Sequence, residues 1–328
     1  MVSNREKLTT PLKNSLLKSD AHPDWCPGCG DFGITNAIQS AVAELGCKPW
    51  ETYFFTGVGC SGKTSHYVQV YGAHTLHGRV LAFAAGAKIS NPRMTVIAGG
   101  GDGDGYGIGA GHFMHAGRRN LDMTYVVFNN EVYGLTKGQA SPTLPQGAQP
   151  KSLSLPNPVQ GINPLALAIA SGYTFVARSY AFDARHLKAT IKAAIDHPGM
   201  ALVDVLQPCP TYNDLHTKDF YAETVTLNGQ EMPRVKYLED EGYNGEVSNP
   251  DDAAEVESKR AAALARAYQA EAQVALGTFW QIRKPTFSEI LAGNVSTFQQ
   301  TTPAETPIMD AQGRPTTDAA CALNGFVV

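Results

Sequence analysis

The chain has 328 residues, of which 43% are hydrophobic and 17% charged, a composition typical of one large or two small globular domains. Its net charge of −4 provides no broad basic surface for nucleic acid, and it contains no uninterrupted run of about 18 apolar residues that would predict a membrane span. The first residues lack the apolar core of a signal peptide, so we expect a cytoplasmic protein.

Predicted helices and strands alternate through the first two thirds of the chain. Apolar residues at helical spacing predict a helix over Asp31–Gly46, and a short apolar run predicts a strand over Glu51–Phe55. Further strands are predicted at Met94–Ala98, Leu121–Phe128, Thr174–Ala177 and Ala201–Leu206, and further helices at Arg79–Ala87, up to Met114, at Leu165–Ser171 and at Ala184–Ala194. This alternation predicts an α/β fold, a parallel sheet with helices on both faces. The loops after its strands meet at the carboxyl edge, where open α/β folds bind ligands.

The regions on either side of this pattern differ from it in composition. Residues 1–24 are polar and turn-rich and are predicted to form an N-terminal arm before the main domain at 25–230. Residues 231–298 begin with an acidic stretch, which we expect to be solvated, and continue into an Ala-rich helix predicted at Ala253–Val274. Residues 299–328 are rich in Thr, Pro and Ala, which is typical of an extended tail that wraps a partner chain or is disordered.

The loop after the first predicted strand matches a nucleotide-binding pattern. Gly57–Thr64 reads G-x-x-x-x-G-K-T, which alone would indicate a P-loop nucleoside triphosphatase. No apolar strand ends directly in an aspartate that could hold Mg²⁺, since three glycines precede Asp102. Cys60 also lies in the middle of the loop, where it needs another explanation. The triphosphatase is therefore the less favoured alternative.

A second glycine-rich loop carries a more complete set of groups. Gly101–Gly105 follows one predicted strand and contains Asp102, and Asn129 and Asn130 follow the next strand. Mg²⁺ prefers such hard oxygen ligands, and glycines let backbone N–H groups approach phosphates. We therefore favour a magnesium diphosphate site over the alternative, a simple glycine-rich turn beside an unrelated asparagine pair.

The cysteines predict a metal site at the same edge. Cys26 and Cys29 form a C-x-x-C motif, and Cys60 and Cys209 lie in loops after predicted strands. Four cysteines suit Zn²⁺ or an iron–sulfur cluster, and disulfides are rare in a reducing compartment. The nearness of Cys60 to the predicted diphosphate site favours a redox cluster; a zinc-stapled scaffold subunit without catalytic activity is the alternative. The two remaining cysteines, Cys47 and Cys321, lack such a context.

Several motifs together carry a family resemblance. In chain order they are WCPGCGDFG, GVGCSGKTSH, HGR with AxGAKxSNP, GGGDGDGYGIG, FNNEVYGLTKGQxSPT and CPTYN. As a set they resemble the β subunit of the 2-oxoacid:ferredoxin oxidoreductases, the chain that binds thiamine diphosphate. The resemblance covers roughly residues 20–290, including LGTFWQIRKPTFSE near the end.

The resemblance implies a fold and a set of ligands. The fold would be the diphosphate-binding domain of thiamine enzymes, followed by a C-terminal helix and tail. Asp102, Asn130 and the Val132 carbonyl would hold Mg²⁺. One [4Fe–4S] cluster would be held by Cys26, Cys29, Cys60 and Cys209. The residues implied to line the thiamine diphosphate are Val58, Gly59, Cys60, Ser61, His77, Gly103, Asp104, Gly134 and Leu135.

The resemblance also implies an activity. It is the coenzyme A-dependent oxidative decarboxylation of a 2-oxo acid to acyl-CoA and CO₂, or its reversal, with electrons passing through the cluster to ferredoxin. We favour 2-oxoglutarate as substrate, with a pyruvate-specific enzyme as the alternative. An α subunit would supply the glutamate that activates thiamine, so the chain would be inactive alone. Lys63, His66 and Lys137 are candidates to neutralise a substrate carboxylate or a coenzyme A phosphate; ordinary surface cations are equally compatible with the pattern.

Overall fold

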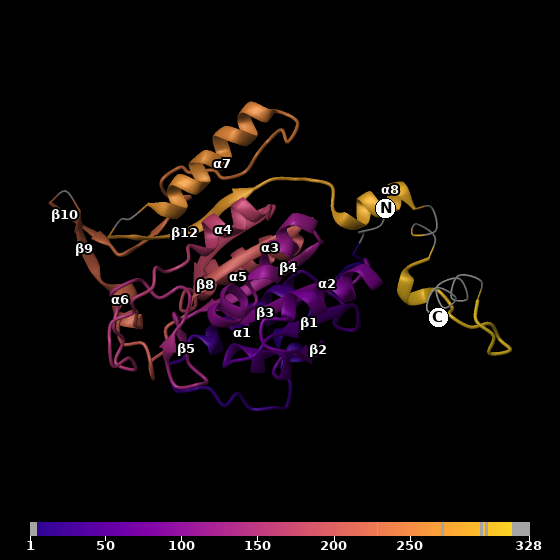
Figure 1. The fold of residues 1–328 in the computed structure, drawn as a ribbon, viewed down its shortest axis with the longest axis horizontal. Coiled ribbons are helices and arrows are strands. Elements are labelled where there is room, and N and C mark those ends of the chain that lie inside the picture. The colour runs from indigo at the N-terminus through magenta and orange to yellow at the C-terminus, as the bar shows by residue number, and fades with distance from the viewer. Residues whose placement is uncertain (1–4, 228, 270–271, 296–297, 299–300, 317–328) are drawn as a thin grey trace.

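An eight-stranded sheet forms the centre of the computed structural model, which describes residues 5–227, 229–269, 272–295, 298 and 301–316. Its strand order is β11-β12-β7-β8-β4-β3-β1-β2. Figure 1 labels several of these strands, among them β12, β8, β4 and β1. The strands are β1 Thr52–Thr56, β2 Tyr71–His74, β3 Thr95–Gly101, β4 Met123–Asn129, β7 Phe175–Tyr180, β8 Met200–Leu206, β11 Val235–Tyr237 and β12 Val274–Gln281. All neighbouring strands run parallel except β12, which is antiparallel to β7.

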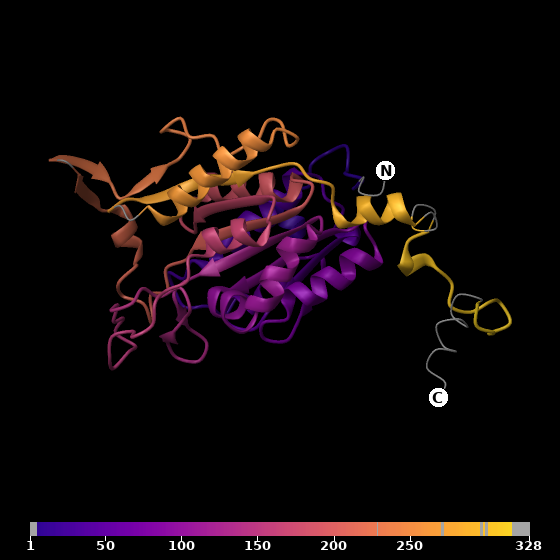
Figure 2. The same cartoon turned by 45° about the horizontal axis from the view of Figure 1, so that its top comes forward.

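Helices cover both faces of this sheet, which confirms the predicted α/β architecture (Figure 2). On one face, α1 (Asp31–Glu44) and α5 (Ala184–Asp196) bury apolar residues against the sheet. The helices on the other face are α2 Val80–Ser90, α3 Ala110–Arg119, α4 Pro164–Ser171 and α7 Ala253–Tyr268. Strands β3, β4 and β8 lie between these layers and are buried along almost their whole length, as expected of parallel strands covered on both sides.

The remaining elements are short. They are the 3₁₀ helices Asn14–Leu17, Pro49–Glu51, Ser61–His66 and Pro303–Glu305, the π-helix Gly103–Ile108, the hairpins β5–β6 (Val132–Tyr133 and Gln139–Ala140) and β9–β10 (Thr224–Leu227 and Gln230–Pro233), and the helices α6 Lys218–Ala222 and α8 Phe287–Asn294. Among the described residues, no helix is both long enough and apolar enough to cross a membrane.

The prediction for the region after residue 231 was partly wrong. The helix predicted at Ala253–Val274 ends at Tyr268, and Val274 begins strand β12. The acidic stretch is not wholly solvated either, since Leu238 is fully buried. The Ala-rich composition continues beyond the end of α7, so the sequence pattern predicts a longer helix than the structure has. Strand β12 is instead fixed by contacts with distant residues: the Trp280 indole N–H donates to the Tyr173 carbonyl at 3.0 Å. This segment therefore completes the sheet.

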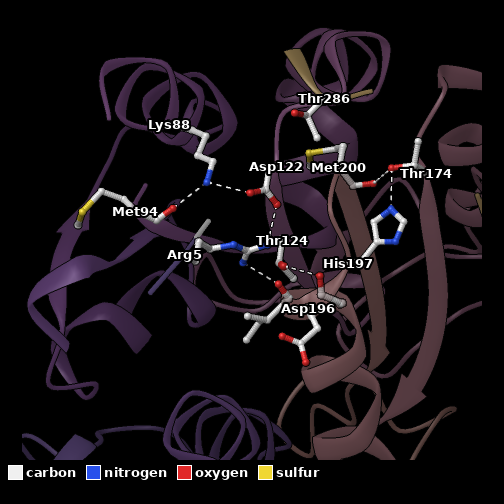
Figure 3. A network of polar contacts seen from close by, with 12 residues as sticks. Arg5, Lys88, Met94, Asp122, Thr124, Thr174, Asp196, His197, Met200 and Thr286 are labelled. Atoms are coloured by element: carbon white, nitrogen blue, oxygen red, sulfur yellow. Dashed lines mark hydrogen bonds and ion pairs between the residues drawn. The ribbon is translucent and has the colours of Figure 1, made fainter. Parts of the chain in front are cut away.

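The N-terminal arm is anchored at the amino edge of the sheet by a buried ion network (Figure 3). The Arg5 guanidinium donates to Asp122 Oδ1 at 2.7 Å and to the Ile195 carbonyl at 2.6 Å. Lys88 Nζ lies 3.1 Å from Asp122 Oδ2 and donates to the Met94 carbonyl at 2.8 Å. Two cations from distant parts of the chain thus converge on one carboxylate. Of the predicted tail at 299–328, residues 317–328, with Cys321, lie outside the described part of the chain.

Candidate active site

A cavity of about 270 Å³ lies at the carboxyl edge of the sheet, between the loops after β1, β3 and β4. Its lining residues are Val58, Gly59, Cys60, Ser61, His77, Gly101, Asp102, Gly103, Asp104, Asn130, Val132, Tyr133, Gly134, Leu135 and Thr136. Every residue that the resemblance implied for the diphosphate, the thiazolium or Mg²⁺ is in this set. The strand ends therefore bring together, in one place, groups separated by almost 80 positions in the sequence.

Asp104 holds the loops that form one side of the cavity. Its Oδ1 accepts hydrogen bonds from the backbone N–H groups of Val58 at 3.0 Å and Gly78 at 2.8 Å, and lies 2.9 Å from His77 Nδ1. The carboxylate is buried, and a side chain at Gly57 could not be accommodated, because its Cβ would lie 2.0 Å from Asp104 Oδ2. A charged acceptor binds N–H donors strongly, so Asp104 fixes the shape of the cavity wall.

Asp102 lines the cavity and is buried. The Ser141 and Thr143 hydroxyls donate to its Oδ2, the second at 2.6 Å. Burial raises the pKa of Asp102 to about 6, while these two hydroxyl donors act in the opposite direction. A nearby cation would favour the ionised form, so this carboxylate suits a metal ligand.

The second predicted magnesium-binding segment turns back on itself beside Asp102. Asn130 Oδ1 accepts the Val132 backbone N–H at 3.0 Å, and both residues line the cavity. The turn between them includes Glu131, whose φ of +65° is unusual for a residue with a side chain. Oxygen groups from two neighbouring strand ends thus reach the same cavity, as the spacing of Asp102 and Asn130 predicted.

The four predicted cluster cysteines lie beside the cavity. In the C-x-x-C turn the Cys29 N–H donates to the Cys26 carbonyl at 3.0 Å, and Gly28 adopts the φ of +81° that such a tight turn requires. Cys26 is exposed, Cys60 is partly buried, and Cys29 and Cys209 are buried. The Trp25 indole N–H donates to the Cys60 carbonyl at 2.8 Å, which joins this turn to the first cavity loop.

Gly134 lies between two of these thiols. A Cβ at this position would be 3.6 Å from Cys60 Sγ and 3.8 Å from Cys209 Sγ, so sulfurs from two loops flank one cavity-lining residue. Burial raises the pKa of the Cys60 thiol to about 11, and the neighbouring Asp31, Cys209 and Cys26 add to this rise. Burial also raises the pKa of Cys29, again with contributions from Cys209 and Cys60. Cys29, Cys60 and Cys209, which come from three different loops, therefore lie near one another.

Within the described residues, no group of three or more His, Cys, Asp or Glu side chains is already arranged to hold a metal ion. The donor types nevertheless fit both predicted groups. Asp102 and Asn130 offer hard oxygen ligands at one cavity wall, as Mg²⁺ prefers. The thiols beside Gly134 offer soft ligands that suit iron–sulfur clusters, and Gln207 Nε2 donates to Cys29 Sγ at 3.2 Å, a contact of the kind that tunes such clusters.

The three candidate catalytic cations do not line the cavity. Lys63 Nζ pairs with Asp24 at 2.7 Å, and His66 is exposed. Lys137 is exposed in a turn with a φ of +81°. The segment Ser61–His66 forms a six-residue 3₁₀ helix, whereas a P-loop leads into an α-helix. The structure thus gives no support to the triphosphatase alternative.

Sequence reasoning missed several residues of the site. Tyr133 and Thr136 line the cavity, and Ser141 and Thr143 bind Asp102. The two hydroxyls follow Asp102 by 39 and 41 positions, a separation at which no sequence periodicity connects residues. Their only sequence signal is membership of the SPT motif that contributed to the family resemblance.

Comparison with protein families divides the chain into two matched parts. Residues 57–205 match the thiamine pyrophosphate enzyme family, C-terminal TPP binding domain. Residues 209–294 match the family defined by the C-terminal part of the pyruvate ferredoxin oxidoreductase β chain. The first match spans the cavity loops described above, and the second spans strand β12 and the region in which the sequence-based prediction was partly wrong.

Individual relatives match along nearly the whole chain. The 2-oxoacid:ferredoxin oxidoreductase subunit beta of Saccharolobus solfataricus is 48% identical over 90% of this chain and 93% of its own length. The subunit beta of oxidoreductase 1 from Aeropyrum pernix is 48% identical over 91% of each chain. A solved structure, the 2-oxoglutarate:ferredoxin oxidoreductase from Magnetococcus marinus with 2-oxoglutarate, coenzyme A and succinyl-CoA bound, has a TM-score of 0.77 and 33% identity over 90% of this chain and 94% of that one. These matches confirm the resemblance seen in the motifs: the chain belongs to the β subunits of the 2-oxoacid:ferredoxin oxidoreductases, which are oxidoreductases with a thiamine diphosphate-binding domain.

Proposed function

We propose that this chain binds thiamine diphosphate with Mg²⁺ and acts with an α subunit to decarboxylate 2-oxoglutarate oxidatively to succinyl-CoA and CO₂. The observation that carries the proposal is the single cavity lined by every residue implied for the cofactor. Asp102, Asn130 and the Val132 carbonyl would hold Mg²⁺. Thiamine diphosphate, when bound, supplies the electron sink that makes loss of CO₂ possible. The surrounding residues orient it and shield it from water.

One [4Fe–4S] cluster on Cys26, Cys29, Cys60 and Cys209 would accept the electrons and pass them to ferredoxin. Support comes from position: Gly134 lines the cavity and lies between the thiols of Cys60 and Cys209. A cluster held there would be adjacent to the cofactor, which shortens the path for electrons. The exposure of Cys26 gives the same group of thiols a side that faces solvent, where an external carrier can approach.

Two observations support the partner and substrate assignments. The curated relatives are named as subunit beta, which implies a second kind of subunit. The similar structure from Magnetococcus marinus is a 2-oxoglutarate enzyme, and 40% identical relatives from Mycobacterium tuberculosis and Archaeoglobus fulgidus are named for 2-oxoglutarate. We expect kcat/KM for 2-oxoglutarate to exceed that for pyruvate when ferredoxin reduction is measured on the enzyme purified with its partner subunit. A higher value for pyruvate would reverse the substrate assignment.

The magnesium assignment is tested by binding. Asp102→Ala removes the carboxylate ligand, so calorimetric titration with thiamine diphosphate and Mg²⁺ should show no measurable binding. Asp20→Ala, which changes an exposed aspartate in the N-terminal arm, is the matched control and should bind as the wild type does. Affinity of Asp102→Ala within a few-fold of the wild type would exclude Asp102 as the metal ligand.

The cluster assignment is tested by iron content. Cys209→Ser exchanges a soft thiolate for a hard hydroxyl and should reduce iron, sulfide and the visible absorption of anaerobically purified protein. Cys47→Ser is the control: Cys47 is also buried but lies just beyond the C-terminal end of α1, next to Lys7 in the arm, whereas Cys29 lies just before the N-terminal end of this helix. A full complement of four irons in Cys209→Ser, or zinc in a colourless wild type, would overturn this part of the proposal.

A further inference from the structure

A second cavity, of about 400 Å³, shares one wall with the cofactor cavity. Asn130 and Val132 line the cofactor cavity, whereas Asn129 and Glu131, which alternate with them in the sequence, line the second cavity. The segment Asn129–Val132 therefore separates the two cavities. Groups in the second cavity can act on the predicted metal ligands through this segment without touching the metal or the cofactor.

Glu131 is the strained residue of this wall. Its φ of +65° lies in the left-handed region, which a residue with a Cβ adopts only at a cost in free energy. Strain of this kind persists only where the surrounding structure maintains it. The contacts of the Glu131 side chain and backbone therefore explain how the turn between Asn130 and Val132 keeps its conformation.

Two residues hold the Glu131 side chain. His216 Nδ1 donates to Glu131 Oε2, and Asn213 Nδ2 donates to the same oxygen at 3.3 Å. The side chains of Glu131 and His216 are only 16% and 24% exposed, so water screens this contact little. Asn213 Nδ2 also donates to the Asn130 carbonyl at 3.1 Å, which fixes the backbone just before Glu131.

The backbone of Glu131 is connected to the other predicted metal ligand. Its carbonyl accepts the Ser141 N–H at 3.1 Å, and the Ser141 hydroxyl donates to Asp102 Oδ2. Glu131 thus lies between Asn130 and Val132 in the sequence and also binds the residue that binds Asp102. Its conformation bears on the surroundings of all three predicted Mg²⁺ ligands.

The loop after β8 supplies both residues that hold Glu131, and contacts within this loop fix its shape. The Asn213 N–H donates to the Cys209 carbonyl at 3.0 Å. Asn213 Oδ1 accepts the backbone N–H groups of Leu215 at 3.0 Å and His216 at 3.3 Å. The His216 ring also packs on Phe220, with the ring centroids 4.7 Å apart. His216 is therefore held in place independently of Glu131.

We propose that Glu131 and His216 are positioning residues, whose contact keeps the Asn130–Val132 turn in the left-handed conformation that presents the Asn130 side chain and the Val132 carbonyl to Mg²⁺. Neither residue lines the cofactor cavity. They act by raising the fraction of the protein that has the binding conformation before the metal arrives. This inference rests on the proposed function, because it requires Mg²⁺ at this site.

The contrast between alanine and glycine at position 131 tests the role of strain. The assay is calorimetric titration with Mg²⁺, at a fixed excess of thiamine diphosphate, of the enzyme purified with its partner subunit and stripped of metal by chelation. Glu131→Ala loses the contact with His216 but keeps a Cβ, so the Kd for Mg²⁺ should rise about tenfold. Glu131→Gly also loses the contact but adopts a positive φ without strain, so its Kd should stay within about threefold of the wild type. Equal affinities in the two variants would refute the proposal.

Substitutions of His216 test the contact from the other side. His216→Phe keeps a ring beside Phe220 but removes the donor, so the Kd for Mg²⁺ should rise about tenfold, and His216→Asn, which retains an N–H donor, should restore most of the affinity. In the Glu131→Gly background, His216→Phe should have no further effect. Wild-type affinity in His216→Phe would overturn the proposal.

His186→Phe is the matched control for these variants. His186 is also partly buried, and its Nδ1 lies 2.8 Å from Ser179 Oγ, but it lines neither cavity. The Kd for Mg²⁺ should therefore equal that of the wild type. A tenfold rise in this variant would mean that the loss of any buried histidine contact weakens metal binding, and the specific role of His216 would be refuted.

Asp102→Ala in the same assay separates this inference from the proposed function. If Asp102→Ala binds Mg²⁺ as the wild type does, the metal lies elsewhere and both proposals fail. If Asp102→Ala does not bind Mg²⁺ but His216→Phe and Glu131→Ala bind it as the wild type does, the magnesium site is supported and the positioning role of Glu131 and His216 is refuted. Loss in Asp102→Ala together with the expected alanine–glycine contrast supports both.

Discussion

Replacement of Asp122 by asparagine should lower the free energy of unfolding by about 3–5 kcal/mol at pH 7, because two cations then lose the carboxylate they share. Lys88 and Asp122 are 0% and 1% exposed, and Arg5 reaches the same carboxylate from the N-terminal arm (Figure 3). Asparagine keeps the shape of the side chain but removes its charge. The expected fall in the free energy of unfolding therefore comes mainly from lost electrostatic interactions and not from altered packing.

The pKa of Lys88 sets the size and the pH dependence of this effect. Burial lowers the pKa of Lys88 from 10.5 to about 8, and Asp122 acts against that decrease. Keeping Lys88 protonated at pH 7 therefore costs the folded state about 3 kcal/mol. Because its pKa is lower in the folded than in the unfolded state, this cost is complete below pH 8 and disappears as the pH rises from 8 to 10.5. Without Asp122, the pKa of Lys88 should fall further, so that more of the buried amine is neutral, which limits the damage.

Urea unfolding of four proteins measures these quantities: the wild type, Asp122→Asn, Lys88→Met and the double variant. We expect the double variant to be at least about 1 kcal/mol more stable than the sum of the single changes predicts, because it contains no unpaired buried ammonium. Between pH 7 and pH 10, the wild type should gain about 2 kcal/mol relative to Lys88→Met. Additivity within about 0.5 kcal/mol, together with a pH-independent difference, would refute the reasoning.

Three other variants test the site itself. Asp104→Ala removes the acceptor of two backbone N–H groups in the cavity loops, so the free energy of unfolding in urea should fall by about 2–4 kcal/mol; no change would mean that other contacts hold these loops. Gly134→Ala adds a methyl group 3.6 and 3.8 Å from two sulfurs, an ordinary contact, so the melting temperature should not change. The same methyl group would occupy space beside both sulfurs that a cluster needs, so we expect less iron after reconstitution; wild-type iron content would contradict this. Lys63→Ala should leave ATP hydrolysis at background, because Lys63 pairs with Asp24 and Ser61–His66 is a 3₁₀ helix; hydrolysis by the wild type that this variant lacks would restore the triphosphatase alternative.

The sheet and the cavity could be predicted because local signals determine them. Strands β3, β4 and β8 are continuous apolar runs, and the residues after them are placed by the rule that parallel strands end at one edge. Asp102 and Asn130 could be paired across 28 positions for this reason alone. Spacing alone could not predict which residues line the cofactor cavity. That prediction depended on the family resemblance.

The elements that were predicted wrongly or not at all depend on contacts between distant segments. Strand β12 is antiparallel to β7, and its side chains Phe279 and Trp280 are buried by residues about 100 positions away. These long-range contacts leave no trace in the short-range periodicity of the sequence. The Ala-rich pattern of α7 therefore led to a predicted helix that runs into the start of β12. The same holds for Lys63, whose partner Asp24 lies 39 positions earlier in the arm.

Contacts within the chain fix the shape of the cavity more firmly than they fix the positions of the thiols. One oxygen of Asp104 binds two loops, so the cavity wall is set by hydrogen bonds within the protein. The thiols come from three separate loops, and burial raises the pKa values of Cys29, Cys60 and Cys209, which favours neutral sulfur at these three positions until a cation is bound. Gly134 borders both regions, since it lines the cavity and a Cβ at this position would lie 3.6 Å from Cys60 Sγ and 3.8 Å from Cys209 Sγ. A side chain introduced at this one position would therefore approach both predicted binding sites at once.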